Sequence, residues 1–105
     1  MDNVLKLLGL SYRAGLLSSG EFSTEKAIKE RRAKLVIVSE DASFNTKKKF
    51  RDKCVYYNVP CFEFGDKISL GKAFGQTERT SIAVLSEGFA EKIIQTSSLK
   101  EIGVN

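Results

Sequence analysis

The chain has 105 residues, 42% of them hydrophobic and 29% charged, with one proline, which is typical of a single globular domain over residues 1–105 whose core needs no disulfide or metal ion. It contains no histidine and two cysteines, which argues against histidine-dependent catalysis and thiolate zinc sites, so we expect no enzyme, no catalytic residues, no metal and no cofactor. The net charge is +4, and a basic chain without a secretory leader pattern is expected to be cytoplasmic and to bind an acidic partner.

The first predicted element is a helix over residues 3–14, where apolar side chains recur at intervals of three and four. Asp2 or Asn3 caps its start. Gly15 provides the left-handed residue at which the helix ends.

A short strand and a strongly charged helix are predicted next. Residues 16–18 form the strand, which ends at a sharp turn made by Ser19-Gly20. Ser23 is expected to cap the second helix, whose exposed positions are mostly charged. Two arginines, Arg31 and Arg32, fall in the last turn of this helix.

The middle of the chain predicts a buried strand and a lysine-rich helix. Leu35–Val38 is a continuous apolar run between polar flanks, as expected for a strand covered on both faces. A helix over residues 44–58 follows, with Cys54 on its apolar face and basic residues on the other. Glu40 and Asp41 precede it, where capping and dipole complementarity explain them better than acid–base or magnesium chemistry.

The last third of the chain predicts two strands, each followed by a helix. Residues 61–64 form the first strand, and Asp66 caps a helix that runs to Phe74. Residues 81–85 form a second buried strand, and Ser86 caps the final helix. Helices and strands therefore alternate along the whole chain, which predicts an α/β fold, a three-layer α/β/α sandwich on a four-stranded mixed sheet.

Positive charge is concentrated in the middle of the sequence. Residues 26–53 carry ten basic and four acidic residues, a net +6, while the segments before and after each sum to −1. This pattern is typical of a surface that binds a polyanion, although solvated helix faces produce it too. Nucleic acid is favoured over a membrane, because the basic helices lack a wide apolar face and Leu35–Val38 is far shorter than the roughly 20 residues of a membrane span.

Several short motifs occur in a fixed order over almost the entire chain. They are Leu8–Gly15, Ser19-Gly20, Lys26–Ile28, Ala33–Ser43, Lys47–Lys49, Val59-Pro60, Leu70–Gly75 and Gly88–Ala90. Taken together, these motifs resemble the YlxQ-type bacterial branch of the kink-turn RNA-binding ribosomal-protein family, the L-seven-Ae family. The resemblance implies the same α/β/α sandwich, and a partner that is structured, kink-turn-like RNA such as ribosomal RNA, with no small-molecule substrate and no membrane.

The resemblance also implies where RNA binds: at the turn after the first strand, at the start of the second helix, and in the loop before the last strand. A glycine allows close approach of the backbone, free amides at a helix N-terminus receive phosphate oxygens, and a lysine one turn later adds positive charge. The predicted RNA-binding residues are Gly20, Glu21, Phe22, Ser23, Lys26, Lys29, Arg32, Gln76, Thr77 and Arg79.

Two positions depart from the family's pattern. Archaeal-type members present an asparagine–glutamate pair that reads sheared guanine–adenine pairs, where this chain has Phe22 and Ser23, so guanine is read by Glu21 or not by a carboxylate at all. The later loop, apolar in the family, is here Gln76–Arg79. In place of the missing apolar surface, Phe22 can stack on a base, and Arg79 can stack on a base or pair with phosphate.

Two of these residues also have purely structural interpretations. Phe22 is either a stacking platform or a hydrophobic staple that packs on Ala27 or Ile28. Lys26 either contacts phosphate or pairs with Glu30 along its helix.

For two further sets of residues, a purely structural interpretation is favoured over a functional one. Lys47, Lys48 and Lys49 point in different directions around a helix, which favours a solvated helix start over a second polyanion site. Cys54 and Cys61 are expected to be buried small hydrophobes rather than a redox pair.

Two functions follow as hypotheses. The first is a non-catalytic protein that binds bent, structured RNA and associates with ribosomes. The alternative is a protein-interaction module on the same fold that has lost specific RNA binding.

Overall fold

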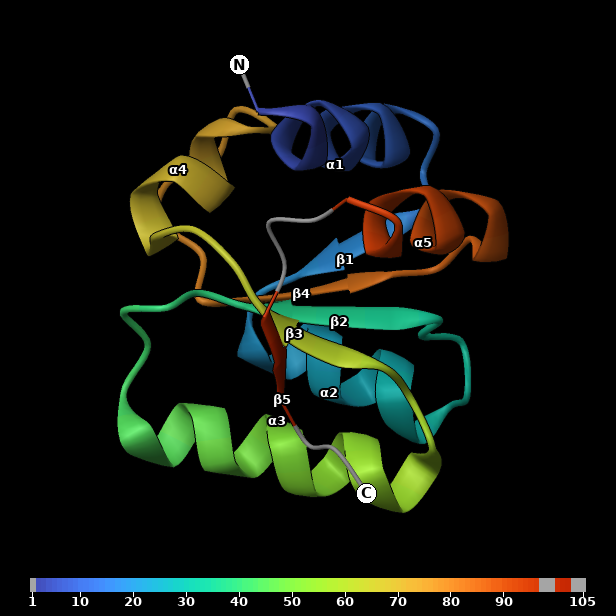
Figure 1. Cartoon of the computed structure of the whole chain (residues 1–105), viewed down its shortest axis with the longest axis vertical. Helices are drawn as coiled ribbons and strands as arrows, with labels where there is room; N and C mark the ends of the chain where they lie inside the picture. The colour runs from blue at the N-terminus through green and yellow to red at the C-terminus, as the bar shows by residue number, and fades with distance from the viewer. Residues whose placement is uncertain (1, 97–99, 103–105) are drawn as a thin grey trace.

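The computed structural model describes residues 2–96 and 100–102 and places one mixed sheet between two layers of helices (Figure 1). The elements in chain order are α1 (Asn3–Arg13), β1 (Leu17–Ser19), α2 (Glu21–Lys29), β2 (Leu35–Val38), α3 (Phe44–Tyr57), β3 (Cys61–Glu63), α4 (Lys67–Lys72), β4 (Ser81–Val84), α5 (Glu87–Ile94) and β5 (Lys100–Ile102). Helices α2 and α3 lie on one side of the sheet and α1, α4 and α5 on the other (Figure 1). The predicted α/β/α sandwich is confirmed.

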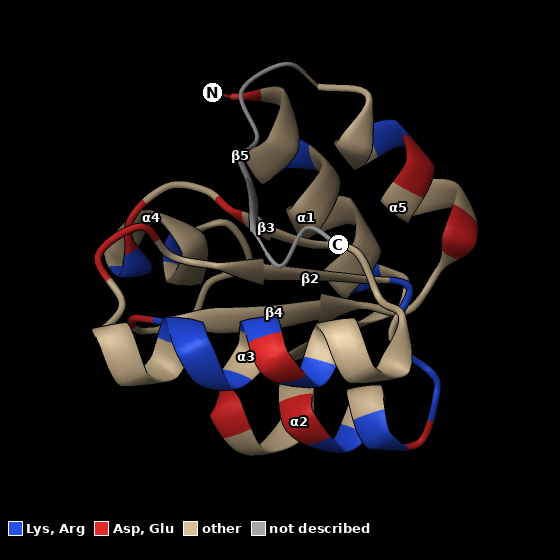
Figure 2. Ribbon diagram, turned by 60° about the horizontal axis from the view of Figure 1, so that its bottom comes forward, with Lys and Arg blue, Asp and Glu red and all other residues tan. Residues whose placement is uncertain are grey.

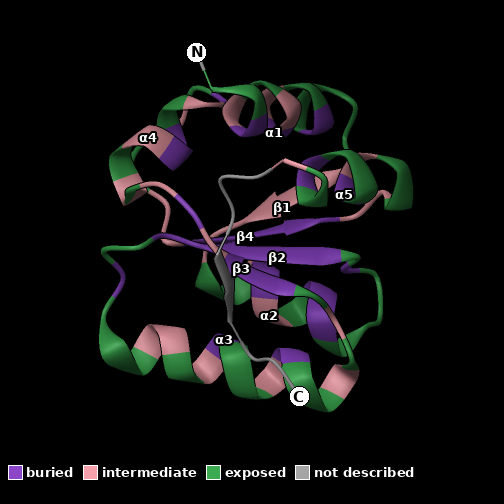
Figure 3. Cartoon of the chain, in the orientation of Figure 1, coloured by how far each residue is buried: buried purple, intermediate pink, exposed green. Residues whose placement is uncertain are grey.

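The central strands β2 and β4 are buried along their whole length (Figure 3). In β2 the side chains alternate between the two layers, because successive residues of a strand point to opposite faces. Leu35 and Ile37 pack with α1, α4 and α5, whereas Val36 and Val38 pack with α2 and α3. The uninterrupted apolar run of this strand thus reflects two hydrophobic cores, one on each face of the sheet.

The strands are ordered β1-β4-β2-β3-β5. β2 runs parallel to β3, while β4 is antiparallel to both β1 and β2. The four predicted strands are all present, and β5 adds a fifth by pairing antiparallel with β3. The sequence gives little sign of β5, because three residues with one apolar side chain make too short a pattern to identify a strand.

The start of α2 differs from the prediction. The helix begins at Glu21 and its N-cap is Gly20, so Ser23 lies inside the first turn and is not the cap. The Gly20 N–H donates to the Ser81 carbonyl (2.9 Å), and its backbone has a φ of 95°. Glycine adopts this conformation without steric cost, and pairing with β4 therefore decides where the helix starts.

Other boundaries differ by one or two residues. β1 covers residues 17–19 instead of 16–18, and α4 ends at Lys72 instead of Phe74. The predicted caps Asp2, Asp66 and Ser86 each accept a hydrogen bond from a first-turn amide. Residues at strand and helix ends are fixed by tertiary hydrogen bonds that local propensity does not include.

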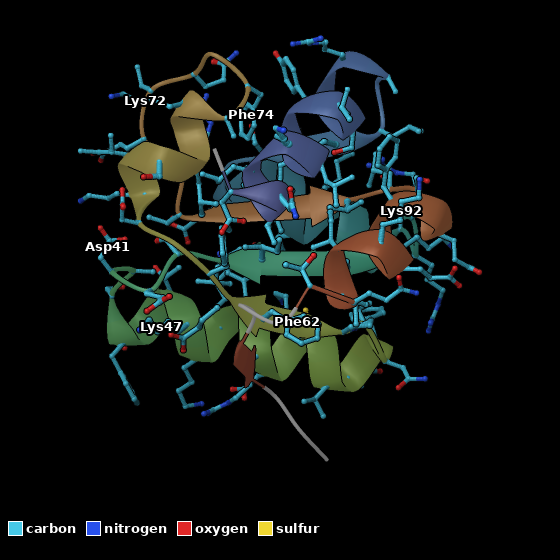
Figure 4. All side chains as sticks on the ribbon, turned by 45° about the horizontal axis from the view of Figure 1, so that its top comes forward. Asp41, Lys47, Phe62, Lys72, Phe74 and Lys92 are labelled. Atoms are coloured by element: carbon cyan, nitrogen blue, oxygen red, sulfur yellow. The ribbon has the colours of Figure 1, made fainter. Side chains whose placement is uncertain are left out.

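Asp41, one of the two acidic residues before α3, has another role than the capping that was predicted. Ser43 is the N-cap of α3, and its hydroxyl accepts from the Thr46 amide (3.1 Å). Asp41 instead accepts from the Lys67 amide at the start of α4 (3.0 Å). Asp41 therefore joins the end of β2 to the neighbouring helix, on the side of the molecule where Lys47 also lies (Figure 4).

Cys54 and Cys61 are free thiols buried in the core between the sheet and α3, as predicted. A hydrogen bond with the Cys54 thiol, together with burial, raises the pKa of Cys61. Both therefore behave as small apolar side chains. Among the described residues, no helix is both long enough and apolar enough to cross a membrane.

Candidate nucleic-acid interface

The structure brings the two predicted RNA-binding segments together at one edge of the sheet. β1 ends at Ser19 beside the start of β4, where Ser19 pairs with Ile82. Gly20 is joined to β4 by its hydrogen bond to Ser81. The Arg79 Nε donates to Ser19 Oγ (3.2 Å), across a separation of 60 positions in the sequence. The turn before α2 and the loop before β4 therefore form one continuous surface.

Arg79 organises the loop to which it belongs. Its Nη1 donates to Thr77 Oγ1 (3.1 Å) and to the Glu78 carbonyl (2.9 Å), and its Nη2 donates to Gln76 Oε1 (3.3 Å). These bonds, with the bond to Ser19, direct the guanidinium toward the protein's own loop. Arg79 is thus placed to hold the loop in shape, a role that the sequence did not predict.

The same loop is anchored to α1. Gln76 Nε2 donates to the Tyr12 hydroxyl (3.1 Å), and the Tyr12 ring stacks on Phe74 at a centroid distance of 5.0 Å. Figure 4 shows Phe74 close to Lys72 at the end of α4. Sequence patterns give no local signal for the contact between Tyr12 and Gln76, because the two residues lie 64 positions apart.

Helix α4 supports the loop through its backbone. The Gln76 amide donates to the Gly71 carbonyl (2.8 Å), and the Arg79 amide donates to the Lys67 carbonyl (2.9 Å). A Cβ added to Gly71 would lie 1.7 Å from the Thr77 carbonyl oxygen. Only glycine fits at this position, so Gly71 shapes the interface without facing it.

The first turn of α2 is open at its start. Gly20 has no side chain to cap the first amides of the helix, and among the described residues no side chain accepts from them there. Such amides carry partial positive charge and point along the helix axis toward a ligand. Phosphate oxygens suit this arrangement.

Phe22 projects from the same turn with 80% of its surface exposed. The staple interpretation is wrong, because Ala27 and Ile28 are fully buried against the sheet while the Phe22 ring stays in solvent. An aromatic ring exposed to this degree costs solvation free energy unless a partner covers it.

Lys26 lies one turn beyond Phe22 and is exposed. The alternative pair with Glu30 is not formed, since the Glu30 carboxylate instead bonds Arg32 Nε (2.8 Å). Within residues 2–96, no carboxylate lies close enough to form an ion pair with Lys26. Phe22 and Lys26 line a surface hollow of about 400 Å³ on the outer side of α2, together with Glu25, Lys29 and Glu30.

Glu21, Lys29 and Arg32 were also predicted to bind RNA. Glu21 is exposed and lies 3.6 Å from the Lys49 ammonium. Lys29 pairs with Glu25 (3.2 Å) in the last turn of α2. Arg32 follows the C-terminal end of α2, so it lies at the end of the helix away from Gly20 and is not brought together with the two loops.

Lysines 47 to 49 all have carboxylate partners. Lys47 pairs with Glu63 of β3 (3.3 Å), and Lys48 with Asp52 (2.8 Å). Lys49 reaches Glu25 of α2 (3.0 Å). Figure 2 shows the resulting mixture of basic and acidic positions on α2 and α3. For Lys47 and Lys48, this pairing favours the solvated helix interpretation over a second open polyanion site, while Lys49 lies where α2 and α3 meet.

Three lysines surround the carboxylate of Glu25 on α2. The pKa of Glu25 falls from 4.5 to about 2, chiefly because the Lys49 ammonium donates to the carboxylate, with further donation from Lys53 and Lys29. Within the described residues, no three His, Cys, Asp or Glu side chains lie close enough together to ligate a metal ion.

Residues 2–94 match the ribosomal protein L7Ae/L30e/S12e/Gadd45 family. The chain belongs to this family. The match extends from the start of α1 to the end of α5. β5 lies outside it, and the family's pattern therefore accounts for four of the five strands.

Two curated relatives of this L7Ae-family protein are named RNA-binding protein YlxQ. The one from Bacillus subtilis (strain 168) is 48% identical over 88 residues, covering 84% of this chain and 88% of the relative. The one from Enterococcus faecium is 42% identical over 91 residues, covering 87% of each.

Two solved structures share the fold. A protein of unknown function from Bacillus halodurans C is 41% identical with a TM-score of 0.86, covering 90% of this chain and 95% of that one. The Giardia lamblia 15.5kD RNA binding protein is 21% identical with a TM-score of 0.78, covering 87% of this chain and 81% of that one. At that identity the second likeness shows the fold alone.

Proposed function

We propose that this protein is a non-catalytic RNA-binding protein that recognises structured RNA with a sharp, kink-turn-like bend. One observation carries the proposal. Exposed Phe22, and Lys26, which has no ion pair among the residues that the structure describes, project from an uncapped helix start beside a loop held in shape by Arg79. The names of the two YlxQ relatives, at 48% and 42% identity, support an RNA partner.

The geometry suits a bent RNA because a bend crowds phosphates together and leaves bases unstacked. The amides at the start of α2 donate to a phosphate, and Gly20, which has no side chain, lets the ribose-phosphate backbone approach. Lys26 neutralises a second phosphate one turn further along. Phe22 stacks on an unpaired base, which is how proteins commonly recognise bases in irregular RNA.

Carboxylate reading of guanine is not part of this proposal. Glu21 lies 3.6 Å from Lys49 and is directed toward α3 by that contact. Ser23 lies within the helix and is half-buried. Stacking on Phe22 therefore takes the place of the asparagine–glutamate pair found in archaeal-type members.

The test compares a kink-turn RNA with a straight duplex of the same base composition in an electrophoretic shift assay. We expect the bent RNA to bind more tightly, with log affinity falling linearly with log salt concentration. Lys26→Ala should reduce the magnitude of that slope by about one, because one phosphate contact is lost. Lys92→Ala on α5, in the other helix layer, is the matched control and should leave the slope unchanged (Figure 4).

Equal affinity for the bent and straight RNAs would contradict recognition of the bend. No binding to either RNA at protein concentrations on the order of tens of micromolar and low salt would contradict RNA binding itself. The protein-interaction alternative would then take its place, and nuclease-resistant partners in a pull-down would identify it.

We also propose that the RNA belongs to a ribonucleoprotein, with the ribosome as the first candidate. The family to which the chain belongs is described as one of ribosomal proteins. The protein should then co-sediment with ribosomal particles and be released by nuclease or high salt. Migration only as free protein would contradict this part of the proposal.

A further inference from the structure

Three lysines converge on one carboxylate where α2 packs against α3. Lys29 and Lys53 lie 3.2 Å from Glu25 Oε2, and Lys49 lies 3.0 Å from Glu25 Oε1. We call Lys29, Lys49 and Lys53 the lysine triad. Two helices contribute to it, and their charged positions lie side by side in Figure 2.

The lysine triad carries more positive charge than its partners neutralise. Three ammonium groups face two carboxylates, those of Glu25 and Glu21, which leaves a net charge of +1. Each ammonium has three N–H donors, and its contact with Glu25 occupies only part of that capacity. The side chains of Lys29 and Lys49 are 53% and 38% exposed, so their remaining donors reach solvent.

The triad adjoins the surface already described. Glu25 and Lys29 line the same hollow as Phe22 and Lys26, on consecutive turns of α2. The ammonium groups of Lys49, Lys53 and Lys29 surround Glu25 at this point and lower the pKa of its carboxyl. A polyanion seated on Phe22 and Lys26 therefore meets the triad as it extends along the helix.

We propose that the lysine triad is a second phosphate-contact surface, which binds the backbone of a duplex arm leading away from the RNA bend. This inference rests on the proposed function and extends it, because the bend alone engages only the start of α2. A simple ion-pair hub that holds α2 on α3 is the competing role. If the triad contacts the arm, replacing its lysines weakens binding only to RNAs whose arm is long enough to reach it. If the triad is only a hub, the loss of binding is the same for long and short arms.

The experiment uses the full chain and kink-turn RNAs in which each arm in turn is either trimmed to its closing pairs or lengthened by one helical turn. The test variant combines Lys29→Gln, Lys49→Gln and Lys53→Gln. On the RNA with the long arm, the magnitude of the salt slope should fall by about one to two and affinity by roughly tenfold. On the RNA whose corresponding arm is trimmed, the variant should bind like the wild type.

Three controls keep the inference separate from folding effects. The triple arginine variant, Lys29→Arg with Lys49→Arg and Lys53→Arg, keeps the charge and should keep the arm-dependent binding. Lys48→Gln removes an exposed lysine of α3 outside the triad and should change nothing. If the triple glutamine variant does not fold, Lys29→Gln alone serves, because its ion pair lies within α2 and does not join the helices.

The outcomes are distinct. Arm-dependent loss of binding supports the triad as a phosphate surface. Binding by the glutamine variants with wild-type affinity and slope on the long arm, while Lys26→Ala is impaired, would overturn the inference and leave the proposed function intact. Equal losses on long and trimmed arms would also overturn it, because they indicate a structural hub. Failure of the wild type to bind any bent RNA would overturn both proposals.

Discussion

The two segments that meet at the candidate interface differ in what their side chains do. At the start of α2, Phe22 is exposed and Lys26 forms no ion pair within the described part of the chain. In the loop before β4, the side chains of Gln76 and Thr77 are bonded to Arg79, which reaches across to Ser19. The first segment leaves side chains exposed, and the side chains of the second hold their own loop in shape beside it.

This difference shows that the polar character of a loop does not by itself predict whether its side chains are free to meet a ligand. Both segments are polar, and both were predicted as RNA-binding from their place in the chain. Internal partners separate them, because every guanidinium nitrogen of Arg79 already donates within the protein and must break such a bond before it can serve a ligand. We therefore expect variants at the start of α2 to lose RNA affinity without losing stability, and variants that disturb the loop before β4 to lose both.

The largest effect is expected from Gly71→Ala. The added methyl group would overlap the Thr77 carbonyl, so the loop must move away from α4. We expect a loss of about 3 kcal/mol in the free energy of unfolding, a typical upper cost of overpacking, together with weaker RNA binding. Urea unfolding and the electrophoretic assay measure the two effects. Gly88→Ala on α5, where the nearest atom lies 3.8 Å from the added Cβ, is the control.

Arg79→Ala tests whether Arg79 holds the loop in position or contacts RNA itself. The variant loses four hydrogen bonds to Ser19, Thr77, Glu78 and Gln76, several of them exposed, and we expect about 2 kcal/mol of lost stability. RNA affinity should fall with it, because the loop no longer stays beside α2. If affinity falls while stability is unchanged, Arg79 contacts RNA directly and the comparison of the two segments is wrong.

Phe22→Ala should show the opposite behaviour. An exposed ring contributes nothing to the core, so stability should stay unchanged, while RNA affinity falls by about 1–2 kcal/mol through the lost stacking. Tyr56→Ala is the matched control, because Tyr56 is 78% exposed and lies in the last turn of α3. Loss of stability in Phe22→Ala would show that the ring packs on the protein.

The smallest effect concerns pH and tests whether Glu25 joins the two helices. Its pKa is lowered from 4.5 to about 2, so its ion pairs stabilise the fold fully above about pH 4.5. That contribution, about 1 kcal/mol for a partly exposed group, is lost as pH falls toward 2. Unfolding free energies of the wild type and Glu25→Gln should therefore differ at pH 6 and converge as pH approaches 2. A constant difference across that range would contradict the role of the ionised carboxylate.

The layered fold could be predicted from sequence because its strongest signals are local. Two runs of the sequence, Leu35–Val38 and Ser81–Val84, contain no polar residue except Ser81. This is enough to place them at the centre of a sheet. Asp66 and Ser86 cap helices at the expected places for the same reason, since a cap needs only its own first turn.

The interface could be predicted only in outline. Local propensity favours Ser23 as a cap, but the hydrogen bond from Gly20 to Ser81 starts the helix earlier, and that bond depends on strand pairing. The contacts of Arg79 with Ser19 and of Gln76 with Tyr12 join residues 60 or more positions apart. No pattern in one sequence encodes such pairs, so the roles of individual loop residues required the structure.

The position of β1 has a consequence for how the protein is made. β1 lies at the edge of the sheet and pairs with β4 alone, although β1 and the helix α2 that follows it are synthesised well before β4. Until β4 emerges, Gly20 has no carbonyl partner and the Arg79 loop does not exist. Growing chains should therefore be unable to capture RNA, and the ability to bind should be acquired only once the last central strand has been inserted.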